Sequence, residues 1–274
     1  MLATLFFAAD VTPLSSEKLL NIGPLAFTNS MLFGLITAAF VVTFFMLAAS
    51  WSQLFPKSKL AFLAETLVEF VLGLATDNFG DRKKALKHLP LLLTLFSFIF
   101  AANLSGLLPG VGTLVVHQGD KNAPLFRAFT TDLNATLAMA ILTIGTVQFY
   151  ALKELGLKGH LKHYFTNKPW NPMNAFIGLN EILGEFIRII TLSMRLFGVV
   201  YAGEVLLHAI GQLAGNFAWA ATIPVFFLEI FFSTIQAYLF MMLTTVYLSI
   251  ATSHEEEAPG SVDHLAVTSS SSSI

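Results

Sequence analysis

Long apolar runs dominate this chain and predict five helices able to cross a lipid bilayer. A hydrocarbon core about 30 Å thick needs roughly 20 mostly apolar residues per crossing helix. Three runs have about that length, Met31–Trp51, Leu89–Leu108 and Asp132–Leu152. Two runs, Asn171–Ile210 and Ala218–Ala251, are longer than one perpendicular crossing requires, since forty helical residues measure about 60 Å. We therefore expect the last two helices to be tilted and to form an antiparallel hairpin.

A sixth helical segment, Leu60–Phe79, has a different pattern. Glu65 and Glu69 are four residues apart and Asp77 lies beyond them, so carboxylates follow one stripe of an otherwise apolar helix. Such a helix is typical of a segment that lies in the membrane interface. The predicted fold is an all-α polytopic membrane protein with five transmembrane helices and one interfacial amphipathic helix.

The distribution of Lys and Arg predicts the orientation, because cytoplasmic loops carry the excess of positive charge. If residues 60–79 do not cross, the basic residues divide cleanly between the two sides, with the N-terminus outside and the C-terminus inside. The cytoplasmic group is Lys57, Lys59, Arg82, Lys83, Lys84, Lys87, Lys153, Lys158, Lys162 and Lys168. The outer group is Lys18, Lys121 and Arg127.

The composition supports a single membrane domain over residues 1–252, with residues 1–29 as an outer segment and 172–252 as the tilted hairpin. Mean hydropathy is +0.71 and only 12% of residues are charged, about half the share in soluble domains. A net charge of −2 argues against nucleic-acid binding. The chain has no Cys, which excludes thiolate chemistry. The acidic, Ser-rich tail 253–274 is expected to be disordered.

Arg195 is the residue that most constrains the function. It lies in the stretch 189–203, which holds no other charge, and no Lys or Arg follows it. Placing a guanidinium at mid-membrane costs at least ~2.5–3.5 kcal/mol on insertion scales, and the group cannot lose its proton to avoid that cost. An intramembrane arginine is therefore predicted to be functional and to need an anionic or dipolar partner.

Other polar residues of the last two helices are predicted to lie above and below Arg195. Glu204 is nine residues further on, about 13 Å along the axis and on the opposite face. In an antiparallel hairpin, Gln236 falls level with Arg195 and can satisfy some of its donors, and Glu229 falls near the depth of Glu204. Carboxylates on both sides of a fixed positive charge are typical of an interrupted proton path.

Glu181 and Glu185 lie about 15–21 Å from Arg195 toward the predicted inside. Two interpretations of them stay open, part of the path or ordinary charges at headgroup level. Glu185 is three residues from Arg188 and can pair with it. His208, four residues after Glu204, is either a further outer proton carrier or a headgroup-level residue.

Four segments of the chain resemble subunit a of rotary F-type ATP synthases. The most specific is Ser193-Met-Arg-Leu-Phe-Gly-Val-Val-Tyr-Ala-Gly-Glu204. The resemblance continues in Asn103-Leu-Ser-Gly-Leu-Leu-Pro109, in Asp132-Leu-Asn-Ala-Thr136 and in Gln236-Ala-Tyr-Leu-Phe-Met-Met-Leu-Thr-Thr-Val-Tyr-Leu-Ser249. It covers roughly residues 30–252. One departure is Val199, where relatives often carry Asn after Leu-Phe-Gly.

The resemblance implies a role for each candidate. Arg195 is similar to the stator arginine that faces a ring of c subunits, with Gln236 beside it. Glu204 and Glu229 are similar to the outer half-channel, and Glu181 to the inner one. The implied partners are the c ring, the peripheral-stalk b subunits, the rest of the ATP synthase and the lipid bilayer. The implied location is a bacterial inner membrane or, alternatively, that of an organelle.

Competing functions make different demands on the sequence. A secondary proton-coupled transporter favours paired halves with broken helices, and no internal repeat is visible. A purely structural scaffold predicts that Arg195 is replaceable. There is no Walker motif, so no ATP site or other cofactor is expected in this chain, and no catalytic turnover of its own.

The topology is testable by single-cysteine labelling, because the chain naturally has no Cys. Cysteines introduced at positions 121 and 160 should react with membrane-impermeant reagents from opposite sides, with position 160 on the cytoplasmic side. Equal labelling of both positions from outside would contradict the predicted orientation.

Overall fold

Six long helices make up most of the described chain. The computed structural model describes residues 18–22, 25–51, 58–108, 111, 115–118, 121–124, 126–164 and 172–253. The helices are α2 (Asn29–Ser50), α3 (Lys59–Phe79), α4 (Arg82–Gly106), α5 (Leu133–Tyr164), α6 (Pro172–Ala214) and α7 (Ala218–Ser253). The acidic tail from residue 254 and the chain before residue 18 lie outside the described residues.

Five helices of the described part are long and apolar enough to cross a membrane, namely α2, α4, α5, α6 and α7. α3 is not among them. Its carboxylates Glu65, Glu69 and Asp77 are all exposed, while Val71 and Ala75 on another side of the helix are buried in the bundle. The predicted membrane fold of five crossing helices plus one amphipathic helix is confirmed.

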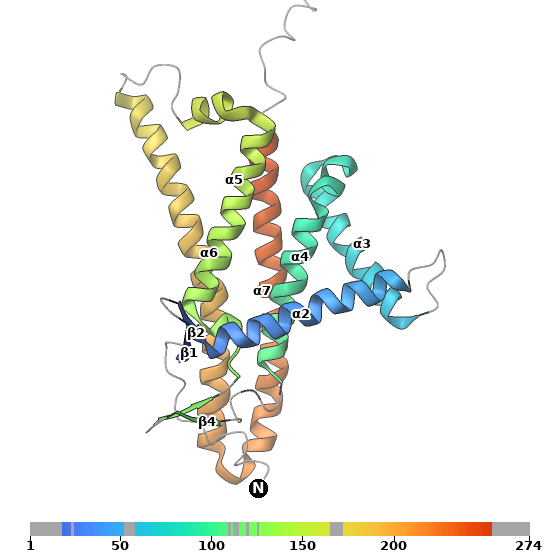
Figure 1. The fold of residues 1–274 in the computed structure, drawn as a ribbon, viewed down its shortest axis with the longest axis vertical. Helices are drawn as coiled ribbons and strands as arrows, with labels where there is room; N and C mark the ends of the chain where they lie inside the picture. Colours follow the sequence, from blue (N-terminus) through green and yellow to red (C-terminus); the bar gives the residue numbers. More distant parts are fainter. Residues whose placement is uncertain are drawn as a thin grey trace, which may run out of the picture.

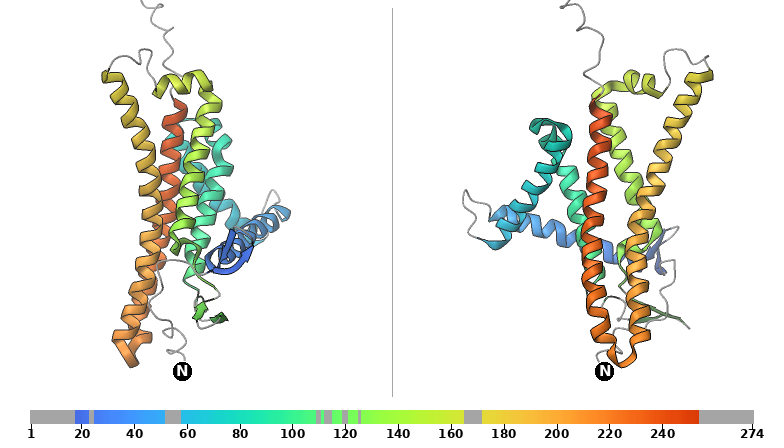
Figure 2. Two further views of the ribbon diagram at one scale, coloured as in Figure 1. Left: turned by 60° about the vertical axis from the view of Figure 1, so that its left-hand side comes forward. Right: turned by 180° about the vertical axis from the view of Figure 1, so that it is seen from behind.

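The long pair α6 and α7 is antiparallel, and it crosses α2 at a steep angle (Figure 1). The two sets of helices cannot both stand along a membrane normal. The 43 residues of α6 measure about 65 Å, roughly twice a hydrocarbon core. A helix of this length either tilts in the bilayer or extends beyond its hydrocarbon core. Toward its N-terminal end α6 also diverges from α5 and α7 (Figure 2).

The helix ends are set by local signals. Between α3 and α4, Gly80 adopts a left-handed φ of 67°, which favours glycine, and its N–H donates to the Thr76 carbonyl (2.9 Å). Asp81 then caps α4 by accepting from the Lys83 N–H (2.9 Å). At the start of α5 the same role falls to Asp132, which accepts from the Asn134 N–H (3.0 Å).

Several boundaries differ from the sequence prediction. α4 begins at Arg82, well before Leu89. Its first two turns carry basic residues on the exposed side and bury Ala85 and His88 on the other. α5 extends to Tyr164 with a break at Gly156 (φ 72°). α6 runs to Ala214, beyond the predicted end at Ile210, and the 3-10 turn η2 (Gly215–Phe217) joins it to α7.

Short strands lie outside the membrane helices, where the sequence suggested no secondary structure. β1 (Lys18–Ile22) pairs with β2 (Leu25–Thr28), and β4 (Val115–Gln118) pairs with β5 (Lys121–Pro124), both antiparallel. The β1–β2 hairpin lies beside the start of α2, and the second hairpin, between α4 and α5, lies nearer the end of the molecule where α6 turns into α7 (Figure 1). They leave the helical class unchanged.

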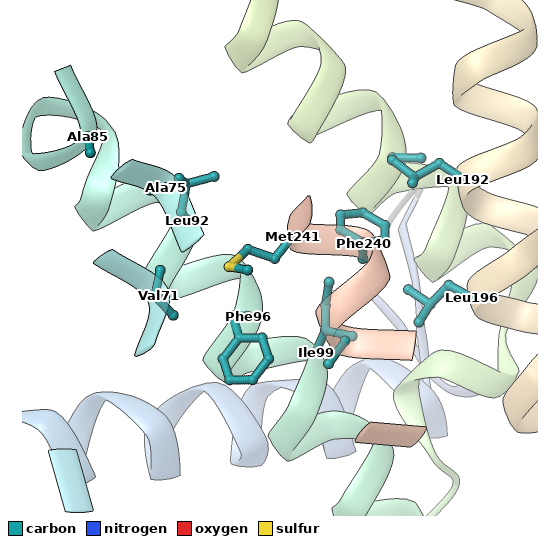
Figure 3. Close-up of a cluster of buried hydrophobic side chains, with 12 residues drawn as sticks. Val71, Ala75, Ala85, Leu92, Phe96, Ile99, Leu192, Leu196, Phe240 and Met241 are labelled. Carbon is teal, nitrogen blue, oxygen red and sulfur yellow. The ribbon is translucent and has the colours of Figure 1, made fainter. Parts of the chain in front are cut away.

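The core is an apolar cluster in which α7 is central. Phe240 and Met241 of α7 are fully buried. Figure 3 shows Val71 and Phe96 on one side of them and Leu192 and Leu196 of α6 on the other. Lipid tails are as apolar as these side chains, so exclusion of water does not drive the helices together in a membrane. The contact depends instead on close packing.

Candidate functional site

Arg195 projects from the outside of the bundle. Its neighbours Leu192, Ser193 and Leu196 are buried, and the Ser193 hydroxyl hydrogen-bonds the Thr136 hydroxyl of α5 (3.2 Å). These contacts hold one side of α6 against α5 and α7. Arg195 itself is exposed, and none of the described residues forms a hydrogen bond or ion pair with it.

The side chain of Gln236 lies inside the bundle and forms no hydrogen bond with Arg195. Its side chain is buried, and its Nε2 has no hydrogen-bond partner among the described residues. Since no described residue hydrogen-bonds Arg195, the expectation that Gln236 satisfies some of the Arg195 donors is not met in this isolated chain. One helical turn before Gln236 on α7, the Ser233 carbonyl accepts a hydrogen bond from the Asn103 Nδ2 of α4 (3.4 Å). The Asn103 Oδ1 has no hydrogen-bond partner in the described part.

Glu204 and Glu229 are brought together, as the hairpin geometry predicted. The two carboxylates interact electrostatically across the α6–α7 contact. Glu229 is only 5% exposed, and one oxygen of each carboxylate is buried with no hydrogen-bond partner among the described residues. Gly203 makes room for this arrangement, because a Cβ at that position would overlap the Glu229 carboxylate.

His208 lies on the same layer, one helical turn beyond Glu204. Its Nδ1 is 2.9 Å from the Glu204 carbonyl oxygen. A carbonyl oxygen only accepts, so Nδ1 carries the hydrogen of that bond. In the neutral ring, Nε2 is then the acceptor nitrogen.

Arg127 is a member of this region that the sequence analysis missed. The sequence predicts only an outer loop charge at this position, yet Arg127 is 4% exposed and interacts electrostatically with Glu204. Its position in a polar loop between two helices carried no signal of burial. Only the packing of that loop into the bundle reveals it.

Of the two residues predicted to lie toward the inside, Glu181 and Glu185, the second contacts Arg188. Its guanidinium pairs with the Glu185 carboxylate, as the three-residue spacing predicted. It also lies over the Tyr247 ring of α7, 4.7 Å from the ring centroid, a cation–π contact that ties α6 to α7. The side chain of Glu181 lies outside the described residues.

The described residues hold no cluster of three or more His, Asp or Glu able to bind a metal ion. The side chains gathered here include groups that can take up and release protons. The arrangement combines exchangeable carboxylates and an imidazole on one layer with a permanent charge at the surface of the bundle.

Comparison with known proteins identifies the family. Residues 31–249 match the family described as ATP synthase A chain.

This chain belongs to the ATP synthase A chain family.

Relatives named ATP synthase subunit a agree along most of the chain. The Haemophilus ducreyi protein is 37% identical over 234 residues, covering 81% of this chain and 87% of its own length. The Enterococcus faecalis protein is 32% identical over 252 residues, covering 89% and 100%. A Chlorobium luteolum protein named ATP synthase subunit a 2 is 32% identical over 81% of this chain, and the matched part spans 63% of that longer protein.

The segments that carried the resemblance to this ATP synthase family contact one another in space. Ser193 and Thr136 come from two of them and share a hydrogen bond. Asn103, from a third, donates to Ser233, three residues before the fourth segment begins at Gln236. Motifs spread over more than half of the chain thus lie on, or hydrogen-bond to, helices α6 and α7.

The close contact between Gly203 and Glu229 generates a test that changes no titratable group. Gly203→Ala should displace the Glu229 carboxylate and slow proton-driven ATP synthesis by the assembled complex about tenfold, since an error of ~1 Å in a reacting group can cost as much as ~10²-fold. Gly145→Ala on α5 is the matched control, because no atom lies within 4 Å of a Cβ there. Equal rates for the two variants would show that the position of Glu229 does not matter.

Proposed function

We propose that this chain is the stator-side proton-conducting subunit of a rotary F-type ATP synthase. It provides two offset half-channels to the carboxylates of a c ring and separates them with Arg195. The observation that carries the proposal is the exposure of Arg195 on an apolar helix surface, without a partner among the described residues.

The surface around Arg195 is suited to another membrane protein. Ile187, Ile190 and Met194 of α6 are exposed beside it. A lone guanidinium facing lipid costs at least ~2.5–3.5 kcal/mol. An ionised carboxylate on a neighbouring subunit would remove much of that cost and be attracted to the same place, as the moving carboxylate of a c ring requires.

The outer half-channel is assigned to the row Glu204, Glu229 and Gln236, with Asn103 beside it. Glu229 and Gln236 are seven residues apart on α7, about 10 Å along the axis. Each of these four side chains has a buried polar atom with no hydrogen-bond partner among the described residues. Buried polar groups of this kind are usually satisfied by water, so the row supports a hydrated route from the outer layer toward the depth of Arg195. His208 lies at its outer end.

The inner half-channel is assigned to Glu181 and Glu185, on the opposite side of Arg195. Support comes from the divergence of α6 from its neighbours toward this end (Figure 2). The Glu185–Arg188 pair is part-buried rather than sealed in the core. Arg188 stays anchored on Tyr247, so Glu185 can exchange its proton without α6 losing its contact with α7.

The mechanism follows from the cost of charge in lipid. A c-ring carboxylate that reaches the interface ionised is attracted to Arg195 and must be protonated through the outer half-channel before it re-enters lipid. After nearly a full turn it returns and releases the proton to the inner half-channel. Arg195, which is never neutral, prevents protons from passing directly between the two routes.

The setting of this function is a multi-pass protein of a bacterial inner membrane, assembled with a c ring, peripheral-stalk b subunits and the rest of the synthase. The chain itself contributes proton transfer rather than a catalytic turnover. A secondary transporter is less well supported, because α6 and α7 run without the breaks that form midplane substrate sites.

Replacement of Arg195 tests the proposal directly. Arg195→Ala should insert and assemble, because removal of a charge does not add to the cost of insertion. It should abolish ATP synthesis and ATP-driven pumping together in reconstituted vesicles. Met194→Ala, at the adjacent exposed position, should keep most of the coupled activity. Coupled synthesis near the normal rate in the Arg195→Ala variant would refute the proposed function.

The lysine variant separates charge from geometry at the same position. Arg195→Lys should also couple poorly, because an ammonium lacks the planar fork of the guanidinium and can lose its proton when desolvated.

Passive proton leak measured in the same vesicles should rise in the Arg195→Ala variant, since nothing then separates the two half-channels.

Glu229 tests the outer half-channel. Glu229→His should be tolerated better than Glu229→Leu, because an imidazole can still accept and release a proton. Proton-driven ATP synthesis at equal levels of assembled complex is the measurement. If the Leu and His variants worked equally well, Glu229 would not lie on the path.

A further inference from the structure

One charged pair lies on α6 between Arg195 and the predicted inner end of the helix. Arg188 is seven residues before Arg195, two helical turns or about 10 Å along the axis and on nearly the same face. Its partner Glu185 is about one turn further toward the inner end. The Arg188 side chain is 40% exposed and that of Glu185 is 21% exposed, so neither is sealed in the core. A proton that leaves the depth of Arg195 along this face of α6 therefore meets the pair.

Arg188 has two partners of different kinds. Its Nη1 donates to the Glu185 carboxylate, and its Cζ lies 4.7 Å from the centroid of the Tyr247 ring. The carboxylate belongs to α6 and carries a charge that a proton can neutralise. The ring belongs to α7, and its face attracts the guanidinium whether or not the carboxylate is charged. A guanidinium suits both contacts, because its N–H groups form a planar fork and its delocalised charge binds to aromatic faces.

The pair lies where α6 leaves the helical bundle. No described residue of α6 from Leu179 to Thr191 is buried, whereas Leu192, the next residue, is 2% exposed. Figure 2 shows α6 separating from α7 toward this end. The contact between Arg188 and Tyr247 is thus made where the separation begins, and it fixes the position of the neighbouring Glu185 carboxylate.

Each member of this group depends on the others. An ionised carboxylate without a positive neighbour is costly in an apolar medium, so an unpaired Glu185 would keep a proton and could not accept the next one. When Glu185 does take up a proton, Arg188 loses its ionic partner. The Tyr247 ring then remains against the guanidinium. The carboxylate can therefore alternate between its two forms while Arg188 always has a partner.

We propose that Arg188 is a positioning residue of the inner half-channel, which is anchored on the Tyr247 ring and holds the Glu185 carboxylate ready to take up the proton that leaves the c ring. This inference rests on the proposed function and describes one step within it. The c-ring carboxylic acid loses the proton, and Glu185 gains it and passes it toward the inner side. Arg188 takes no proton in this transfer, because a guanidinium does not exchange its charge in proteins.

Removal of both charges separates this role from a merely structural one. Apolar residues of similar size can often replace an ion pair without loss of stability, so Glu185→Met combined with Arg188→Met should assemble and show the thermal stability of the unchanged complex. Its proton-driven ATP synthesis in reconstituted vesicles should still fall at least about tenfold per assembled complex, because the carboxylate is gone. Near-normal synthesis by this double variant overturns the proposal.

Single changes test whether Arg188 acts through Glu185. Arg188→Gln should slow ATP synthesis about tenfold when Glu185 is present. In the Glu185→Gln background the same change should cost less than about threefold, because the carboxylate that Arg188 positions is then absent. Arg188→Lys should keep clearly more activity than Arg188→Gln, since a positive charge is retained. The proposal is also overturned by an equal factor in both backgrounds, or by a Lys variant as slow as the Gln variant.

The anchoring contact is tested at Tyr247. Tyr247→Phe keeps the ring face and should synthesise ATP clearly faster than Tyr247→Leu. Phe186→Leu is the matched control, because it removes an exposed ring next to Glu185, and its rate should stay normal. Equal rates for the Phe and Leu variants of Tyr247 would overturn the anchoring role of the ring.

Arg195→Ala in the same vesicles separates the two levels of inference. If that variant is inactive while the Glu185→Met, Arg188→Met double variant works normally, only the role of Arg188 fails. Coupled synthesis near the normal rate in the Arg195→Ala variant would instead refute the proposed function on which this inference rests.

Discussion

The energetic cost of an unpaired charge in an apolar medium is the constraint on which this structure depends. A soluble protein can leave an arginine or a glutamate at its surface in water, whereas the surface of this bundle meets lipid. Each intramembrane charge must therefore have a partner within the chain, a partner in another subunit, or a proton that neutralises it. Arg188, Arg127 and Arg195 are three positive charges in different surroundings.

Arg188 is satisfied inside the chain, by Glu185 and by the face of Tyr247. Arg127 is buried and held by Thr131, with Glu204 within electrostatic reach. Arg195 has neither arrangement among the described residues and lies exposed. The difference follows from helix geometry, because Leu192 and Leu196 occupy the inward side of α6 and leave Arg195 directed away from the core.

Small residues determine how closely the polar groups approach one another. Gly203 admits the Glu229 carboxylate to the surface of α6, and Gly34 and Gly106 admit the segment of the 3-10 turn η1 (Phe129–Thr131) to the bundle. Packing with small residues is a common way to bring backbones together in membranes, where no hydrophobic effect drives helices to associate. Here it also brings the Glu229 carboxylate against the backbone of α6. The hydrogen bonds of Ser30 with Asp132 and of Thr136 with Ser193 stabilise the same region, while Glu204, Glu229 and Gln236 keep buried atoms available to bind water.

The sequence by itself determined the membrane class, the five crossing helices, the amphipathic α3 and the facing of Glu204 and Glu229, because helical periodicity and apolar run length depend only on residues near in sequence. It also singled out Arg195, since one charge in a long apolar stretch is visible without any structure. Tertiary structure alone decided that Gln236 turns inward without reaching Arg195, that Gly203 accommodates Glu229, and that Arg127 leaves the aqueous loop for the bundle interior. These features arise from contacts between segments up to a hundred residues apart, where packing volume and charge, rather than local pattern, select the arrangement.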